Sequence, residues 1–273
     1  MKCEILVDPL MYKPGRDMLD AMYRSSPMLI VRNQRYLGQS DLLMVYGMGH
    51  VGRRPWIDKH LSSGRHMVGF DLGYWMRGGE TDRAMRMTID QDHPQAWLDD
   101  RPAERFDSSG VKLREDYDPN GPIVLVGLGP KTNTALAQPW LTWERDALKR
   151  IRAAYPRAEV IFRPKREDGT TLPGTSKMAG MPIEQVLKGA SLVVCRHSNV
   201  AVDACIAGIP VVCWDGAASA LYGNELAFPV RPTLEQRLRF LRNLAWFQWR
   251  PSEAAQCWQF LLSRIEERDR VAA

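Results

Sequence analysis

The residues best suited to chemistry lie in one short segment, residues 191–215, with the sequence SLVVCRHSNVAVDACIAGIPVVCWD. Its polar turn, residues 196–199, precedes helix-forming residues, so Ser198 or Asn199 would cap a helix. The N–H groups and the dipole at a helix N-terminus attract anions such as phosphate. Asp203 lies about one helical turn further on. The segment therefore predicts an anion site with a carboxylate beside it.

The same segment contains the elements that would position these groups. The apolar runs at residues 192–195 and 211–214 predict two strands, and the helix between them would end at Gly208. Strand, turn, helix, glycine and strand make up one unit of a parallel α/β sheet. The alternative is an ordinary crossover, in which Ser198 only caps the helix and Asp203 is solvated.

This pattern of Ser198, Asp203-Ala204, Gly208 and Pro-Val-Val resembles the donor-binding half of GT-B glycosyltransferases. The resemblance implies that Ser198 and Asn199 face the phosphates of a nucleotide sugar and that Asp203 binds the ribose hydroxyls. Families with this motif usually carry glutamate at the position of Asp203. The fold implied is α/β and GT-B-like, with two Rossmann-like domains facing a cleft and C-terminal helices.

The turn Arg163-Pro164-Lys165-Arg166 follows a predicted strand at residues 160–163. It resembles the basic or His-Pro turn of GT-B donor domains, which implies a clamp on the diphosphate. Arg163 would bind phosphate oxygens in a bidentate manner, and Lys165 would contribute a point charge. A basic surface turn is the alternative.

The sequence Gly127-Leu128-Gly129-Pro130-Lys131-Thr132 also follows a strand. The small Gly129 would let the backbone approach a ligand, and Lys131 would reach the phosphates. The spacing is not that of a Walker A loop, and a simple tight turn is the alternative.

The catalytic base is expected in the N-terminal half. Asp71, in VGFDLGYWMR, follows an apolar strand, where partial burial would raise its pKa. GT-B phage glucosyltransferases that modify DNA use an aspartate of this domain as the base, so that resemblance allows the role. His50 and His93 are the rival candidates, and all three residues are equally suited to capping helices.

Asp90-Gln91-Asp92 has the Asp-x-Asp spacing of a divalent-metal motif. It lies far in sequence from the nucleotide segment, so we interpret it as a loop. We therefore expect no metal and no cofactor, although a divalent ion is the minor alternative. The resemblance implies UDP-glucose as the donor, which would be a co-substrate.

Arginines and aromatic residues alternate in the N-terminal half, as nucleic-acid binding would require. The sequences DLGYWMR, RMTIDQDHPQAW and GLGPKT resemble phage glycosyltransferases that act on hydroxymethylated pyrimidines. That resemblance implies double-stranded DNA with a flipped modified base as acceptor. The contacts would come from Arg53, Arg54, Tyr74, Trp75 and Arg77. Solvated arginines beside core aromatics are the alternative.

Three functions therefore compete. The first is a glycosyltransferase that acts on the hydroxymethyl group of a modified pyrimidine in DNA. The second is a glycosyltransferase that acts on capsule-like polysaccharide, because such enzymes share the basic turn and the Ser198–Asp203 pattern. The third is a non-catalytic GT-B-like module that binds nucleotide or DNA.

Composition is that of a globular protein, with 273 residues, 45% hydrophobic and 25% charged. Residues 1–121 carry 17 Lys/Arg and 18 Asp/Glu, whereas the remainder carries 20 and 14, so the net charge of +5 resides in the second half. A basic half suits anionic ligands. No apolar run reaches the ~20 residues of a membrane span. We expect buried cysteines, a cytoplasmic location, and neither a membrane nor a protein partner.

The order of elements predicts two domains, residues 1–119 for the acceptor and 120–273 for the nucleotide sugar. Residues 92–121 would be the linker. The first domain would contain strands at 4–7, 28–31, 42–46, 66–70 and 85–89, with helices at 16–23 and 55–61. The second would contain strands at 122–127, 160–163, 192–195 and 211–214, with helices at 143–155, 182–189, 233–247 and 251–268.

Overall fold

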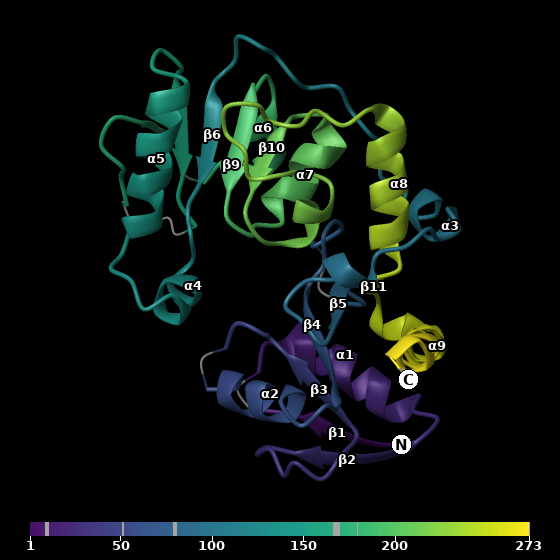
Figure 1. Ribbon diagram of the computed structural model, residues 1–273. Helices are drawn as coiled ribbons and strands as arrows, with labels where there is room; N and C mark the ends of the chain where they lie inside the picture. Colours follow the sequence, from purple (N-terminus) through teal and green to yellow (C-terminus); the bar gives the residue numbers. More distant parts are fainter. Residues whose placement is uncertain (9–10, 51, 79–80, 166–169, 179, 273) are drawn as a thin grey trace. The chain divides into compact units, whose positions relative to one another are not determined.

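A computed structural model describes the chain except for residues 9–10, 51, 79–80, 166–169, 179 and 273 (Figure 1). The chain forms two compact units. The first contains Met1–Trp97 and Trp246–Ala273, and the second contains Leu98–Ala245. The last helix thus joins the first unit, whereas the sequence division had placed it with the second domain.

The first unit is built on a sheet whose described strands follow the order β11-β5-β4-β3-β1-β2. The four strands β1 to β4 are parallel, and β5 and β11 are antiparallel to their neighbours. The strands are β1 (Lys2–Leu6), β2 (Leu29–Asn33), β3 (Leu42–Tyr46), β4 (His66–Leu72), β5 (Met85–Ile89) and β11 (Gln248–Trp249).

Helices pack on this sheet through their apolar residues. Ile57 of α2 lies in one buried cluster with Leu43, Val45 and Met67 of β3 and β4. Helix α9 is fixed to α1 by the Trp258 indole, which donates a hydrogen bond to the carbonyl of Met22 at 2.8 Å. The helices are α1 (Lys13–Arg24), α2 (Arg54–Leu61), η1 (Gln95–Trp97), η3 (Pro251–Glu253) and α9 (Ala254–Ala272).

The second unit contains an entirely parallel sheet with the order β10-β9-β6-β7-β8 in its described part. Its strands β6, β9 and β10 are buried throughout, as expected for a parallel sheet covered on both faces. The strands are β6 (Ile123–Val126), β7 (Val160–Arg163), β8 (Ser176–Lys177), β9 (Leu192–Cys195) and β10 (Val211–Cys213).

Helices connect these strands, and the chain leaves α7 where the sequence predicted. Gly208 has a φ of 77°, a left-handed conformation that ends the helix. The helices are α3 (Glu104–Asp107), α4 (Pro130–Ala135), α5 (Thr142–Ala154), α6 (Ile183–Leu187), α7 (Val200–Ala207), η2 (Ala217–Ala220) and α8 (Leu234–Ala245).

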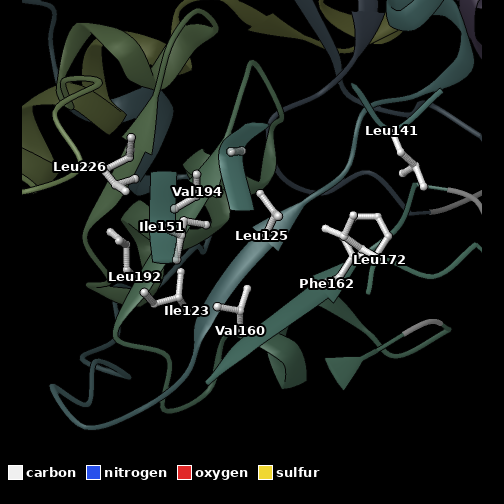
Figure 2. Packing of buried hydrophobic residues seen from close by; sticks show 12 residues of the cluster. Ile123, Leu125, Leu141, Ile151, Val160, Phe162, Leu172, Leu192, Val194 and Leu226 are labelled. Atoms are coloured by element: carbon white, nitrogen blue, oxygen red, sulfur yellow. The ribbon is translucent and has the colours of Figure 1, made fainter. Parts of the chain in front are cut away.

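The core of the second unit fixes its strand ends. Leu125, Phe162 and Val194, from three neighbouring strands, are at most 1% exposed and pack with Ile151 of α5 (Figure 2). Burial of such side chains stabilises the fold by about 1.5–3 kcal/mol each. The loops that follow these strands therefore start from rigid positions.

The predicted elements are confirmed, with ends that shift by at most four residues. The segment predicted as linker, residues 92–121, contains η1 and α3 and otherwise consists of turns and irregular chain. All five cysteines are buried and form no disulfide. Across the described helices, we find none with an apolar stretch that could cross a bilayer.

Candidate functional site

The strand order of the second unit indicates where a ligand can bind. From β6 the chain continues to β7 on one side, whereas β9 lies on the other side of β6. The loops after β6 and β9 therefore diverge, and open α/β sheets bind ligands at this switch point. Thr132, after β6, and His197, after β9, connect the two loops, with 3.1 Å between Oγ1 and Nε2.

The turn after β9 leads directly into α7 (Figure 1). Asn199 occupies the N-cap position, and the backbone N–H of Val200 donates to the Ser198 hydroxyl at 3.3 Å. Both polar side chains are half-buried, as is Asp203 within the first turn of α7. The structure thus places Ser198, Asn199 and Asp203 around one helix N-terminus, where backbone dipoles favour an anion.

The turn after β10 closes against the turn after β9. Arg196 donates to Asp215 at 3.1 Å through Nε, and the Nδ1 atom of His197 lies 3.3 Å from the other carboxylate oxygen of Asp215. Burial acts to raise the pKa of Asp215, but the hydrogen bond and charge of His197 and the charge of Arg196 lower it overall. Asp215 therefore remains ionised beside the imidazole.

Sequence reasoning missed the roles of His197 and Asp215. The only signal was the polar turn 196–199, because Asp215 lies 18 positions beyond His197 and meets it through the pairing of β9 with β10.

A buried carboxylate binds the backbone of the loop after β6. The backbone N–H of Leu128 donates to Glu144 Oε1 at 2.6 Å, and Glu144 is 0% exposed. A Cβ at Gly127 would lie 3.0 Å from the Phe162 ring, so the loop approaches the core closely. Glu144 was not identified from the sequence, although it lies in the first turn of α5.

The two predicted phosphate turns lie side by side. A Cβ at Gly129 would be 3.6 Å from Cδ of Lys165, so the lysine stem passes along the glycine. Arg163 ends β7 and is half-buried, and Lys165 is exposed. The side chain of Lys131 and the whole of Arg166 lie outside the part of the chain that the structure describes.

The first unit brings Asp71 and His93 together through Arg86. Asp71 in β4 is the register partner of Arg86 in β5, and Nη2 lies 3.3 Å from Oδ2. The Nη1 atom of the same arginine lies 3.3 Å from Nδ1 of His93, which is 8% exposed. His50 is exposed in the loop after β3. Asp71 and His93 therefore form one cluster, and His50 lies in a different loop.

Three of the residues predicted to contact DNA are buried in the structure. Tyr74 and Trp75 are 0% and 5% exposed, and their backbone N–H groups donate to Gln248 Oε1 at 2.5 and 3.2 Å. Arg53 is 8% exposed; it donates to the carbonyl of Tyr46, and burial lowers its pKa. These side chains are packing and loop-anchoring residues, which corrects their prediction as contacts to DNA.

The other two predicted acceptor arginines are accessible. Arg54 is exposed and pairs with Asp58 at 2.8 Å and with Asp92 at 3.0 Å. Arg77 is half-exposed in the segment after β4.

The Asp-x-Asp sequence forms a loop after β5, as predicted. Asp90 accepts a hydrogen bond from the backbone of Met67 at 2.7 Å and contacts His66 Nδ1 at 2.8 Å. Asp92 pairs with Arg54. Within the described ranges, no cluster of three or more His, Cys, Asp or Glu residues is arranged to hold a metal ion.

Comparison with known proteins supports a fold but not a family. No family model matches the chain, and no curated protein matches its sequence. Among solved structures, the β Kdo 2,4 transferase of KpsC from Thermosulfurimonas dismutans is similar over 88% of this chain and 89% of that one. Its TM-score is 0.55 and its sequence identity 10%.

The β Kdo 2,7 transferase of KpsC from the same organism is similar over 96% of this chain and 99% of that one. Its TM-score is 0.52 and its identity 13%. An α1,3-fucosyltransferase gives a TM-score of 0.32 at 13% identity, over 89% and 78% of the two chains. The fold is therefore α/β and GT-B-like, as the sequence predicted.

Proposed function

We propose that the chain is a glycosyltransferase that binds a nucleotide-activated sugar at the carboxyl edge of the second sheet. The observation that carries this proposal is the gathering of four strand-end turns around the switch point between β6 and β9. The GT-B-like fold, shared with two sugar transferases, supports it.

The donor would be held by groups of the second unit. Ser198 and the N-terminus of α7 would receive a phosphate, and Asp203 would accept hydrogen bonds from the ribose hydroxyls. Arg163 and Lys165 would neutralise the remaining phosphate charge. Such preorganised donors stabilise the negative charge that develops on the leaving phosphate.

We propose a saccharide acceptor, of the capsule-like polysaccharide class, rather than DNA. Both similar transferases are named for the transfer of Kdo, an acidic sugar. Among the five residues predicted to contact DNA, burial removes Tyr74, Trp75 and Arg53 from any accessible surface. Without stacking rings, recognition of a flipped base loses its main support.

Asp71 is the proposed base. In this role its carboxylate would take the proton of the acceptor hydroxyl as that oxygen attacks the anomeric carbon. Its ion pair with Arg86 and the N–H of Leu72, which donates at 2.8 Å, would hold the carboxylate in one orientation. His93, on the other side of Arg86, would help to hold that arginine.

The test has two stages. Calorimetric titration with uridine, cytidine and guanosine nucleotides first identifies the base of the donor. We expect Asp203→Ala to weaken that binding by ~1–3 kcal/mol, through loss of two ribose hydrogen bonds. Asp146→Ala, an exposed carboxylate of the same unit, is the matched control and should bind as the wild type does.

The second stage is transfer of radiolabelled sugar. Nucleotide-activated Kdo and UDP-glucose are each offered with Kdo-containing oligosaccharides and with DNA that carries 5-hydroxymethylpyrimidines. Label on a saccharide supports the proposal, whereas label on DNA alone would mean that the acceptor is DNA and not a saccharide. Absence of binding to every nucleotide by the wild type would remove the glycosyltransferase proposal altogether.

A further inference from the structure

His197 lies at the centre of the switch point and its position is fixed from three sides. Its backbone belongs to the turn between β9 and α7, next to Ser198. Its Nδ1 atom lies 3.3 Å from Asp215, and its Nε2 atom lies 3.1 Å from the Thr132 hydroxyl. One side chain therefore connects the turns after β6, β9 and β10.

The turn that carries Asp215 is fastened to the turn that carries His197. The carbonyl of Arg196 accepts the backbone N–H groups of Trp214 and Asp215 at 3.1 and 2.9 Å. Gly216 has a φ of 114°, and a Cβ there would lie 2.8 Å from Cα of His197. The close approach thus requires glycine, and it keeps the imidazole and the carboxylate in register.

The partners of the two ring nitrogens define the proton positions. A carboxylate accepts only, so the Nδ1 atom facing Asp215 carries a proton. The Nε2 atom faces the hydroxyl oxygen of Thr132, so it can donate to an oxygen when the ring is protonated. Two charged side chains of the described residues lie in this turn, Asp215 and Arg196, and they bind each other.

We infer that His197, as an imidazolium oriented by Asp215, donates its Nε2 proton to the phosphate oxygen that leaves the sugar. The inference rests on the proposed function and assigns to it a further catalytic residue. Thr132 Oγ1 marks a place for an oxygen within hydrogen-bonding distance of Nε2, and Ser198 lies next in the chain.

Transfer of the sugar breaks one bond, forms another and moves two protons. The bond between the anomeric carbon and the phosphate oxygen breaks, and both electrons stay on that oxygen, which receives the Nε2 proton. The acceptor oxygen forms the new bond to the anomeric carbon and releases its proton to the base. His197 regains its proton from water when the nucleotide departs. General acid catalysis of this kind contributes roughly 10²–10⁴-fold.

The first experiment measures binding of inorganic pyrophosphate by calorimetry at pH 6 and pH 8.5. A protonated imidazole donates from Nε2, whereas a neutral ring with its proton on Nδ1 does not, so the contact is stronger at the lower pH. We expect the wild type to bind about tenfold more tightly than His197→Gln at pH 6, and equally at pH 8.5. Pyrophosphate itself also changes charge with pH, but this affects both proteins equally. The ratio of their two affinities therefore reports only on His197.

Matched variants separate charge, position and folding. Arg157→Gln removes an exposed charge from the same unit and should behave as the wild type does. Asp215→Asn keeps the imidazole and removes its charged partner. The pyrophosphate affinity of this variant should therefore differ less between pH 6 and pH 8.5 than that of the wild type. It provides the test if His197→Gln does not fold.

Nuclear magnetic resonance gives a readout that does not depend on activity. The chain has five histidines, and His197→Gln assigns one set of ring signals in a long-range ¹H–¹⁵N spectrum. Pyrophosphate should shift Nε2 of His197 towards the protonated form and leave Nδ1 protonated. With the donor, we expect turnover of His197→Gln to fall by about 10²-fold with less change in KM.

Equal pyrophosphate binding by wild type and His197→Gln at both pH values, with unchanged ring signals, would overturn the inference. If Asp203→Ala still weakens nucleotide binding in that case, the proposed donor site stands and only the role of His197 is lost. If the wild type binds neither pyrophosphate nor any nucleotide, the proposed function and the inference are both lost.

Discussion

The carboxyl edges of the two sheets have similar topologies but differ in the burial and pairing of their polar side chains. In the first unit, Arg53 lies buried beneath the turn after β3, and Arg86 is paired with Asp71. In the second unit, Ser198, Asn199 and Asp203 are half-buried around the N-terminus of α7, and Lys165 is exposed. The first edge pairs Arg86 with a carboxylate and buries Arg53, whereas the second places polar groups around the N-terminus of a helix, where an anion is favoured.

This difference shows that the strand order selects a place for a ligand but not the chemistry there. Both sheets have a switch point, since β1 lies between β2 and β3 as β6 lies between β7 and β9. In the first unit, Tyr46 borders that place, and burial together with the charge of Asp71 raises its pKa. A neutral phenol and a buried arginine are a poor receptor for phosphate, so we assign the donor to the second unit.

The largest expected effect separates chemistry in the first unit from binding in the second. Asp71→Asn removes the proposed base and should lower turnover by roughly 10²–10⁴-fold, because proton transfer from the acceptor is lost. Nucleotide affinity, measured by calorimetry, should stay within about twofold of the wild type, since the proposed donor-binding groups are all in the second unit.

Asp58→Asn, an exposed carboxylate of the same unit, is the control and should retain normal turnover. A structural role for Asp71, limited to neutralising Arg86, would give the opposite pattern. The variant would then lose stability to urea and keep the activity of its folded fraction.

Much of this comparison was predictable from the sequence. Continuous apolar runs such as IVLV and LVVC, bounded by glycine, proline and polar turns, predict buried parallel strands. Ser198 and Asp203 lie on one local strand–turn–helix unit, so their relative position depends on the short segment 198–203. Local spacing was enough to predict where these two residues lie on α7 and its preceding turn.

The remainder depends on contacts between distant segments, which no local pattern contains. Tyr74 and Trp75 are covered because Gln248, 174 and 173 positions away, binds their backbone. His197 meets Asp215 only because β9 and β10 are paired in one register. Residues with the composition of a binding surface were therefore assigned to the surface, although tertiary packing places them inside.

A smaller effect is expected from two buried glutamates that hold loops in the two units. Glu4, which is 2% exposed, accepts hydrogen bonds from the backbone of Leu37 at 2.7 Å and of Gly38 at 3.3 Å. Glu144 accepts one from Leu128. Alanine at either position removes the acceptor of these backbone N–H groups, so we expect losses of about 2–4 kcal/mol for Glu4→Ala and about 1–3 kcal/mol for Glu144→Ala.

Nucleotide affinity should distinguish the two glutamate variants. Glu144→Ala frees the loop beside Gly129 and should weaken nucleotide binding by several-fold, whereas Glu4→Ala should leave the affinity of its folded fraction unchanged. Urea unfolding and calorimetry measure the two quantities separately. Weaker binding in Glu4→Ala, or unchanged binding in Glu144→Ala, would contradict the assignment of the donor to the second unit.

The smallest effect is a pH dependence expected from the first unit. His66 contacts Asp90 at 2.8 Å and Asp269 of α9 at 3.0 Å. The hydrogen bond to Asp90 is the main cause that raises the pKa of His66 to about 9, against the opposing effect of burial. Because the folded value exceeds the unfolded one, this contribution is fully present below about pH 6.5 and is lost as the pH rises through 9.

We expect His66→Gln to lower the free energy of unfolding by about 1–2 kcal/mol at pH 6.5, a value reduced for solvent screening of partly exposed groups. At pH 10 the difference from the wild type should nearly vanish. Urea unfolding at both pH values measures it, with the exposed His50→Gln as a matched substitution that should change stability by less than about 0.5 kcal/mol. A difference that does not change with pH would mean that His66 stabilises the first unit by packing, because only the charged imidazole gains from Asp90 and Asp269.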